Sequence, residues 1–194
     1  MSTGKTTSVV FVGVGGQGIL LASTVTAKAA MLAGFEVKTN EVHGMAQRGG
    51  SVIAHVRYGA EVFSPTVPEG TADALGSLEE IEALRYAHYI APDGLAVVNA
   101  ASVVPVTVSS GAATYPEDVA DRLRRAFKRL VYFDAGERAV ELGNIRAANI
   151  VLLGALSRGL DLPQEAWKTA IASSVKEKQR DLNLRAFEIG RNVR

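Results

Sequence analysis

The chain has 194 residues, of which 47% are hydrophobic and 21% are charged, a balance typical of a globular protein with a substantial core. Twenty-one basic residues nearly cancel 20 acidic ones, and the net charge of +1 gives no overall field that favours nucleic acid or an anionic membrane. The absence of cysteine excludes disulfides, thiolate-held iron–sulfur clusters and a cysteine nucleophile on this chain. Three histidines without an HExxH-type pair also argue against a zinc site.

The first 40 residues predict a strand, a glycine turn, a helix and a second strand. Residues 8–12 form the continuous apolar run of a buried strand, and residues 19–33 are rich in alanine and leucine, with Gly34 placed to end a helix. Residues 36–39 predict the second strand. This βαβ pattern predicts a three-layer α/β/α Rossmann-like domain with a mostly parallel sheet, which can be mixed.

The middle of the chain predicts further strands and two helices. Residues 51–58 predict a strand, and the segment YGAEVF that begins at Tyr58 predicts a turn with a possible return strand. A loop with two prolines (64–70) precedes a predicted helix at 77–89, a turn at 91–94 and a strand at 95–100. The remaining predictions are a weaker strand at 105–109, a helix at 116–130 and a strand at 130–135.

The last third predicts helices only. Asn144 is a good N-cap for a helix that is apolar nearly all round and should therefore be buried. A second helix starts near Pro163 with an inner stripe of Trp167, Ile171 and Val175, and a short final helix covers 182–190. Without repeats or low-complexity tracts, residues 1–194 are expected to form a single domain.

The segment GVGGQG, which follows the first strand, is a candidate cofactor-binding turn made of Gly13, Gly15, Gly16, Gln17 and Gly18. Its spacing suits a dinucleotide, because free N–H groups at a helix start attract phosphate. A dinucleotide site also needs an acidic residue about 20 positions later, where this chain has Lys38, and Glu41 comes late. Three interpretations stay open: NAD(P) binding, binding of another phosphate-bearing group such as a coenzyme A tail, and a tight turn without a ligand.

A second candidate is the segment EVHGMAQRGGS, which we call the recognition loop (residues 41–51). It offers an imidazole, a thioether, an amide and a guanidinium on a glycine-rich backbone, but no nucleophile. The predicted substrate- or partner-facing residues are Glu41, His43, Met45, Gln47, Arg48, Gly49, Gly50 and Ser51. The alternative is an irregular surface loop with Arg48 in solvent. His55 is expected in the core or at a sheet edge, and His88 on a helix surface.

Several motifs together resemble a known family. They are GVGGQGILLAS, EVHGMAQRGGSV, FSPTVPEGTAD, EALRY, NIRAANIVLLGAL and NLRAFEIG, which follow one another along nearly the full chain. The chain resembles the small (beta) subunits of indolepyruvate ferredoxin oxidoreductases, within the gamma-domain family of 2-oxoacid:ferredoxin oxidoreductases. The fuller HGMAQRGG form is similar to the indolepyruvate branch in particular.

This resemblance implies a gamma-type domain that is an accessory subunit, inactive alone and without a catalytic residue or metal of its own. It implies that thiamine diphosphate and iron–sulfur clusters lie in a large partner subunit, and that ferredoxin interacts through the complex. Coenzyme A would be a co-substrate in the oxidative decarboxylation of an arylpyruvate, and this chain would help to form the coenzyme A region.

Two other functions remain as alternatives at this point: a stand-alone NAD(P)-binding dehydrogenase module, and a nucleotide-sensing or structural interaction domain. We expect a cytoplasmic location, since no apolar run approaches the roughly 18–20 residues of a membrane helix and the first residues lack the features of a signal peptide.

Overall fold

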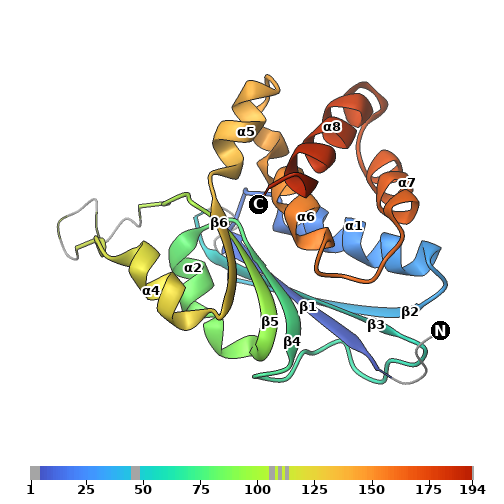
Figure 1. The fold of residues 1–194 in the computed structure, drawn as a ribbon, viewed down its shortest axis with the longest axis horizontal. Helices are drawn as coiled ribbons and strands as arrows, with labels where there is room; N and C mark the ends of the chain where they lie inside the picture. Colours follow the sequence, from blue (N-terminus) through green and yellow to red (C-terminus); the bar gives the residue numbers. More distant parts are fainter. Residues whose placement is uncertain (1–4, 45–48, 105–107, 109–110, 112–113, 194) are drawn as a thin grey trace.

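The computed structural model of the protein describes residues 5–44, 49–104, 108, 111 and 114–193. These residues form one six-stranded sheet with the order β2-β3-β1-β4-β5-β6 (Figure 1). The strands are β1 (Thr7–Val14), β2 (Glu36–His43), β3 (Ser51–Gly59), β4 (Ala72–Ser77), β5 (Ile90–Asn99) and β6 (Arg129–Phe133).

The sheet is mixed, as the sequence allowed. β1, β4, β5 and β6 pair in parallel, whereas β3 runs antiparallel to both β1 and β2. β3 therefore lies between β1 and β2, which point in the same direction. Strands β1 and β3 are buried over most of their length, in keeping with their continuous runs of valine, isoleucine and phenylalanine.

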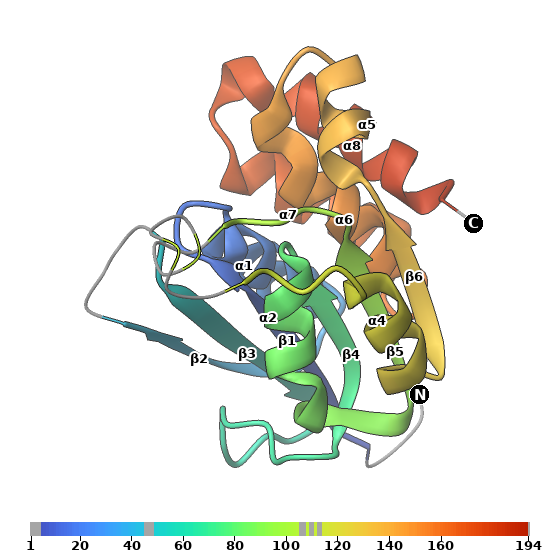
Figure 2. The same cartoon turned by 90° about the vertical axis from the view of Figure 1, so that its left-hand side faces the viewer.

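Helices cover both faces of the sheet (Figures 1 and 2). One face carries α2 (Glu80–Arg85) and α4 (Val119–Ala126), and the other carries the remaining helices. These are α1 (Ile19–Leu32), α5 (Ala135–Glu141), α6 (Ala148–Ser157), α7 (Gln164–Ser174) and α8 (Arg180–Arg191). Three short 3₁₀ turns join them: η1 (Ala87–Tyr89), η2 (Ile145–Ala147) and η3 (Glu177–Gln179).

Each face of the sheet has its own hydrophobic core. The larger core packs α1, α6, α7 and α8 on the sheet around Trp167 and Phe187, whose rings are stacked with centroids 6.0 Å apart. The smaller core packs α2 and α4 around Leu75, Leu123 and Phe127. The three-layer α/β/α prediction is therefore confirmed.

Helix α6 lies at the centre of the larger core. All its residues from Asn149 to Ser157 are buried, which confirms the prediction made from its apolar sequence. Asn144 accepts a hydrogen bond from the Arg146 N–H and so caps the η2–α6 segment, as predicted. α6 crosses α8 so closely that a Cβ on Gly154 would overlap the carbonyl oxygen of Phe187, and one on Gly190 would overlap that of Val151. Only glycine permits this crossing.

Some predictions from sequence are wrong. Residues 60–71 contain no return strand, because the chain leaves β3 and runs irregularly to β4. β4 itself was not predicted, and its last residue, Ser77, had been assigned to a helix. The segment at 91–94, predicted as a turn, belongs to β5 at an irregularity in its pairing with β4. α5 was not predicted, and the helix predicted at 116–130 is limited to α4.

The histidine predictions can be compared with the structure directly. His55 is buried in β3, where its Nδ1 accepts the Val67 N–H at 2.9 Å and its ring meets Tyr89 edge-on, as expected for a core histidine. His88 lies in η1 with its side chain about half exposed. Most of the strand predicted at 105–109 lies outside the described residues. Across the described part of the chain, the helices are all too short or too polar to cross a membrane.

Candidate functional site

The glycine turn joins β1 to α1, and Gln17 holds it in place. The Val14 N–H donates to Gln17 Oε1 at 2.8 Å, and Gln17 Nε2 donates to the Leu78 carbonyl at 3.0 Å. The Gln17 side chain thus folds back over the turn and reaches the residue that follows β4. It satisfies two backbone groups that a ligand would otherwise meet.

This turn lies at a topological switch point of the sheet. The helix after β1 packs on one face and the helix after β4 on the other, although the two strands are parallel neighbours. Crevices of this kind, outside the carboxyl ends of parallel strands, are the usual ligand sites of open α/β sheets. Asn99, at the end of β5, spans the same edge, since its Nδ2 donates to the Leu78 carbonyl at 3.1 Å and its Oδ1 accepts the Ala135 N–H at 2.8 Å.

A cavity of about 770 Å³ opens beside the turn. Its walls come from the glycine turn, the segments that follow β4, β5 and β6, and the starts of α5, η2 and α6. The lining residues are 16–18, Leu78, 99–102, Asp134, Gly136, Glu137, Val140, Ile145, Arg146, Ala148 and Asn149. Residues far apart in the sequence therefore meet at one carboxyl edge of the sheet.

Asn149, in the first turn of α6, ties that helix to the glycine turn. Its side chain is 3% exposed, and its Nδ2 donates to the Gly18 carbonyl at 3.1 Å. Gly18 has a φ of +88°, and a Cβ at this position would overlap Asn149 Nδ2, so both conformation and space require glycine. Asn149 Oδ1 is buried and has no hydrogen-bond donor among the described residues.

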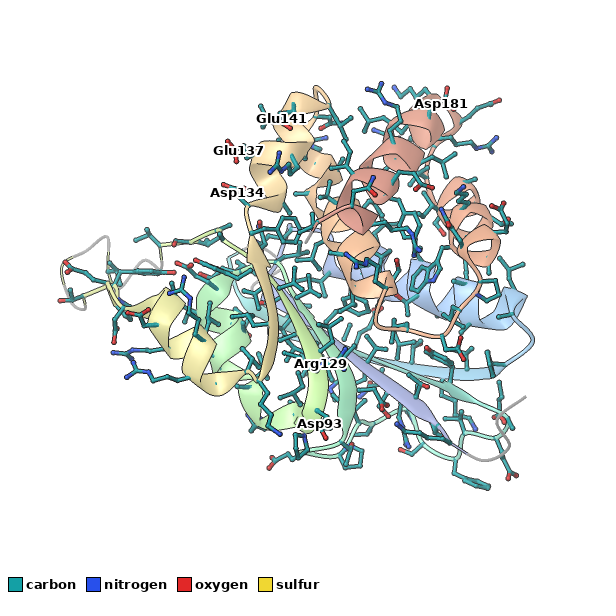
Figure 3. The ribbon with its side chains drawn as sticks, in the orientation of Figure 1. Asp93, Arg129, Asp134, Glu137, Glu141 and Asp181 are labelled. Carbon is teal, nitrogen blue, oxygen red and sulfur yellow. The ribbon has the colours of Figure 1, made fainter. Side chains whose placement is uncertain are left out.

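The charged groups of the cavity lie mainly on the segment after β6 (Figure 3). Asp134 Oδ1 accepts the Glu137 N–H at 2.8 Å and so caps α5. Glu137 has no ion-pair partner among the described residues, and Arg146 contributes a single positive charge from η2. Two carboxylates and one guanidinium leave this wall acidic.

The recognition loop meets the glycine turn at its base. The Gly15 N–H donates to the Gly50 carbonyl at 2.8 Å, and the Gly49 N–H approaches the Gly15 carbonyl at 3.4 Å. The two predicted motifs are therefore neighbours. Met45, Gln47 and Arg48 lie outside the described residues, as does the His43 side chain, although His43 ends β2. Their predicted role in recognition stays a prediction.

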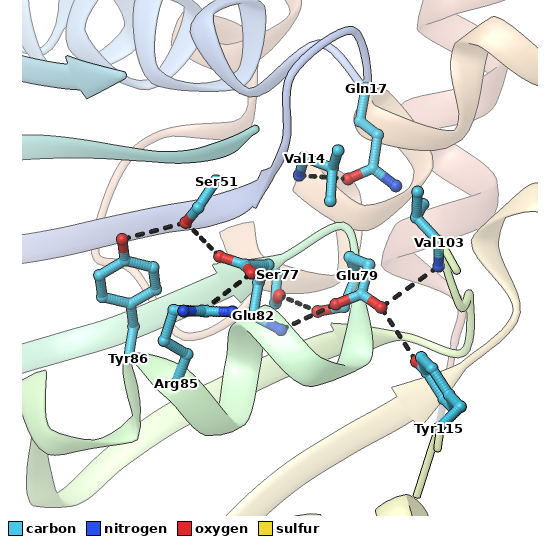
Figure 4. Close-up of polar contacts among 10 residues, drawn as sticks. All are labelled: Val14, Gln17, Ser51, Ser77, Glu79, Glu82, Arg85, Tyr86, Val103 and Tyr115. Atoms are coloured by element: carbon cyan, nitrogen blue, oxygen red, sulfur yellow. Dashed lines mark hydrogen bonds and ion pairs between the residues drawn. The ribbon is translucent and has the colours of Figure 1, made fainter. Parts of the chain in front are cut away.

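The last residue of the recognition loop, Ser51, lies next to Gly50 and is held by α2 (Figure 4). Ser51 donates its hydroxyl proton to Glu82 Oε2. The Tyr86 hydroxyl lies 3.0 Å from Ser51 Oγ, and because the Ser51 proton is already engaged, Tyr86 is the donor and Ser51 Oγ the acceptor. Glu82 is 5% exposed and also accepts from Arg85 Nε at 3.0 Å. A buried carboxylate therefore fixes the first residue of β3.

Two more carboxylates, those of Glu79 and Glu80 at the start of α2, hold the loop that follows β5. Glu79 Oε1 accepts from the Val103 N–H at 3.3 Å and from the Tyr115 hydroxyl at 3.1 Å (Figure 4). Glu80 accepts from the Ser102 hydroxyl and from the Tyr132 hydroxyl. Burial raises the pKa of Glu79 above its usual range.

The pKa values of Tyr115 and Tyr132 both lie above the usual value for tyrosine. Burial raises the pKa of Tyr115, and burial together with the hydrogen bond to Glu80 raises the pKa of Tyr132 to about 12. Both phenols are therefore protonated donors at neutral pH.

The sheet order does not support the dinucleotide interpretation. In that fold the strand after the first helix lies beside the first strand, so its terminal acid reaches the ribose next to the turn. Here β3 separates β2 from β1, which places the end of β2 two strand spacings, about 10 Å, from β1. Glu41 is also engaged elsewhere, because its Oε1 accepts from Ser23 Oγ at 3.1 Å.

Sequence reasoning missed several residues of the cavity. Asn99 ends β5, Asp134 and Glu137 follow β6, and Asn149 lies in α6, so no local motif joins them. Asn99 and Asp134 each stand one residue before the end of a predicted strand (95–100 and 130–135), and that position is the signal that could have found two of them. The described residues hold no cluster of three or more metal-ligating side chains.

Comparisons with known proteins identify the family and the fold. A family model described as pyruvate ferredoxin/flavodoxin oxidoreductase matches residues 8–193. The chain is 47% identical over 193 residues to "Indolepyruvate oxidoreductase subunit IorB" of Thermococcus kodakarensis, covering 96% of this chain and 95% of that protein. Among solved structures, it resembles the gamma subunit of a keto/oxoacid ferredoxin oxidoreductase from Geobacter sulfurreducens, with a TM-score of 0.69, 25% identity and 95% coverage of both chains.

The same fold also occurs within a longer chain. The 2-oxoglutarate:ferredoxin oxidoreductase of Magnetococcus marinus aligns with 98% of this chain but only 31% of its own, with a TM-score of 0.74 and 21% identity. The fold therefore occurs both as a separate subunit and as one part of a larger polypeptide. The match to the family model over nearly the whole chain decides membership: the chain belongs to the pyruvate ferredoxin/flavodoxin oxidoreductase family.

Proposed function

We propose that this chain is the accessory subunit of an indolepyruvate:ferredoxin oxidoreductase, which decarboxylates arylpyruvates oxidatively with coenzyme A as co-substrate. The observation that carries the proposal is the 47% identity to an indolepyruvate oxidoreductase subunit over nearly the full length of both proteins. The identity to the common gamma subunits of the pyruvate/ketoisovalerate oxidoreductases is lower, at 27% for the Pyrococcus abyssi protein and 26% for the Pyrococcus furiosus protein.

The chemistry of the chain supports a division of labour with a larger partner. Without cysteine it cannot hold an iron–sulfur cluster through thiolates, so the clusters and thiamine diphosphate would lie in the large subunit. Ferredoxin would receive electrons from that subunit. The chain itself would supply a preformed surface at the carboxyl edge of its sheet.

We assign the recognition loop to that surface. The end of the loop is fixed at two adjacent residues, by the Gly15–Gly50 backbone bond and by the Ser51–Glu82 bond, and its first residues, Glu41–His43, belong to β2. The glycine turn would then serve mainly to support this loop. A direct contact of the turn with coenzyme A stays a prediction.

Reconstitution tests the proposal. The chain alone should show no activity, whereas co-expression with the large subunit should give indolepyruvate- and coenzyme A-dependent reduction of ferredoxin. Pyruvate and 2-oxoglutarate serve as control substrates, and a complex that prefers either would contradict the indolepyruvate assignment. Stoichiometric binding of NAD(H) or NADP(H) to the isolated chain would instead support the dehydrogenase alternative.

A substitution of Arg48 tests the role of the recognition loop in the same assay. Arg48→Ala should leave the melting temperature of the isolated chain unchanged and lower the activity of the complex by about tenfold or more, the effect of one lost charge-assisted contact. A raised KM for coenzyme A would indicate ligand contact, and weaker subunit affinity would indicate docking. Unchanged activity and assembly would show that the loop is solvated.

A further inference from the structure

Strand β2 forms one edge of the sheet and is open on its outer side. Among the described strands it pairs with β3 alone, in an unbroken register from Glu36 to His43 (Figure 2). Proteins usually protect such an edge with a proline, a bulge or a very short strand, because its free N–H and C=O groups can pair with another chain. β2 has eight residues, no proline and no irregularity in its pairing. Its outer edge is therefore available to a further strand.

The charges on β2 fit a second copy of the same strand. Glu36 and Lys38 lie two residues apart and therefore on one face of the sheet, where Glu36 Oε1 and Lys38 Nζ form an ion pair of 3.2 Å. The Val62 N–H and Lys38 hold the pKa of Glu36 below its usual range, so its carboxylate is charged at neutral pH. In two antiparallel β2 strands related by a twofold axis beside Val37, Glu36 of each copy lies opposite Lys38 of the other. Charges of opposite sign then face each other at both places.

The same argument selects this register over its neighbours. A twofold axis perpendicular to the sheet keeps each face on the same side, so Lys38 can only meet residues that share its face. An axis beside Lys38 would place two lysines opposite each other, and axes beside Thr39 or Asn40 would place Lys38 opposite Asn40 or Val42. Lys38 is the only lysine or arginine of β2, and the axis beside Val37 alone gives it a carboxylate.

Exposed apolar side chains gather around this end of β2. We call them the edge cluster; they lie at the end of α1, directly before β2 and in the loop after β3, and they are Met31, Leu32, Phe35 and Phe63. The loop reaches β2 because the Val62 N–H donates to Glu36 Oε2 at 3.1 Å, which places the neighbouring Phe63, 84% exposed, beside the start of the strand. Exposed aromatic and aliphatic groups that surround a pair of charges are typical of a protein interface.

We propose that β2 pairs with β2 of a second copy of this chain, antiparallel and about a twofold axis beside Val37, so that the two sheets become one. Reciprocal Glu36–Lys38 ion pairs set the register, and the edge clusters of the two copies lie around the axis and lose exposed apolar surface. The inference goes beyond the proposed function and does not depend on it. Because the axis lies near the start of β2, the two recognition loops point to opposite ends of the dimer, and both carboxyl edges stay free for a large subunit.

Sedimentation of the full-length chain alone tests the dimer. We expect a dimer with a dissociation constant of about 1–10 µM, as modest interfaces have. Lys38→Glu places like charges opposite each other at both places and should weaken this constant by tenfold or more. Lys128→Glu makes the same change at an exposed site directly before β6, the strand at the opposite edge of the sheet, and should leave the constant within about twofold of wild type.

A charge exchange between two variants tests the register itself. Glu36→Lys alone should also lose the dimer, because lysines then face each other at both places. In a mixture, however, one copy presents two carboxylates and the other two ammonium groups, so the mixed dimer recovers both ion pairs. We expect an affinity tag on Lys38→Glu to retain Glu36→Lys, and neither variant to retain an untagged copy of itself. Circular dichroism melts confirm that the variants fold.

The outcomes decide the inference without touching the proposed function. A wild-type chain that stays monomeric at about 100 µM would overturn it. Equal effects of Lys38→Glu and Lys128→Glu would overturn it too, and this pair decides even where Glu36→Lys does not fold. Folded Lys38→Glu and Glu36→Lys chains that form no mixed dimer would contradict the register and with it the proposal. A monomeric wild-type chain that binds the purified large subunit tenfold more tightly than Lys38→Glu does would show that the large subunit covers this edge instead.

Discussion

Gln17 and Leu78 connect the segments that follow two neighbouring parallel strands. The Gln17 side-chain amide donates to the Leu78 carbonyl at 3.0 Å, and the Val14 N–H donates back to the same side chain. The glycine turn, which in sequence resembles a phosphate-binding loop, is thus closed by its own glutamine. Its closure makes it a rigid support for the recognition loop, which hydrogen-bonds to Gly15.

Gln17→Ala should therefore destabilise the fold. It leaves the Val14 N–H without its acceptor in a half-buried site and removes one of two donors to the Leu78 carbonyl, a loss of about 1–3 kcal/mol. Urea denaturation measures the change, and Gln17→Met, which keeps the side-chain volume, should be destabilised to a similar degree. A stable Gln17→Met with an unstable Gln17→Ala would show that packing, and not hydrogen bonding, holds the turn.

The bond between Ser51 and Glu82 should be measurable by a double-mutant cycle. Ser51→Ala and Glu82→Ala each remove the same charge-assisted contact in a buried setting, so their costs should not add, and the coupling energy should be about 1–3 kcal/mol. Arg85→Ala is the control: the Arg85 side chain is 59% exposed, and its ion pair with Glu82 should contribute under about 1 kcal/mol. Additive costs would mean that Ser51 is positioned by the backbone alone.

Gly154→Ala and Gly190→Ala should each strongly destabilise the protein. A methyl group at either position overlaps a backbone carbonyl of the facing helix, so α6 and α8 must separate, at a cost of about 1–3 kcal/mol or more. Gly44→Ala is the matched control, because a Cβ there meets nothing within 4 Å. Thermal melts that show equal midpoints for Gly154→Ala and the control would contradict the close helix crossing.

His55 should make stability depend on pH near neutrality. Burial lowers the pKa of His55 below its usual 6.5, so under more acidic conditions the unfolded chain takes up a proton that the folded chain does not. Stability should fall as the pH drops below about 6.5 and be constant above it, with a slope of at most about 1.4 kcal/mol per pH unit from this group. His55→Asn, which can still accept the Val67 N–H, should flatten the profile between pH 5.5 and 7.5. An unchanged slope would assign the effect to other groups.

The sequence predicted well the elements whose pattern is local. β1, α1 and α6 have long apolar or alanine-rich runs with glycine or asparagine at their ends, and each was found where expected. β4 has the sequence ADALGS, with no β-branched or aromatic residue, and it forms because β1 and β5 pair with it on both sides. Tertiary pairing of this kind leaves no local pattern to recognise.

The candidate site divides in the same way. The glycine turn and the recognition loop could each be recognised from their sequence motifs. Their backbone contact, between Gly15 and Gly50, could not be predicted. The cavity depends on Asn99, Asp134 and Asn149, which meet because β5 and β6 end, and α6 begins, at one edge of the sheet. Asn149 Oδ1 is buried and unpaired among the described residues, and no sequence pattern reports hydrogen-bond satisfaction.

The position of β3 between β1 and β2 has a consequence for how the chain folds during synthesis. β1, α1 and β2 leave the ribosome before β3, yet among the described strands β2 forms its ladder with β3 alone. Until residue 59 is available, the nascent chain has a strand with two open edges and an apolar helix with little sheet to cover. A truncated polypeptide that ends at His43 would therefore be prone to aggregation, and the first cooperative folding unit must extend at least to Gly59.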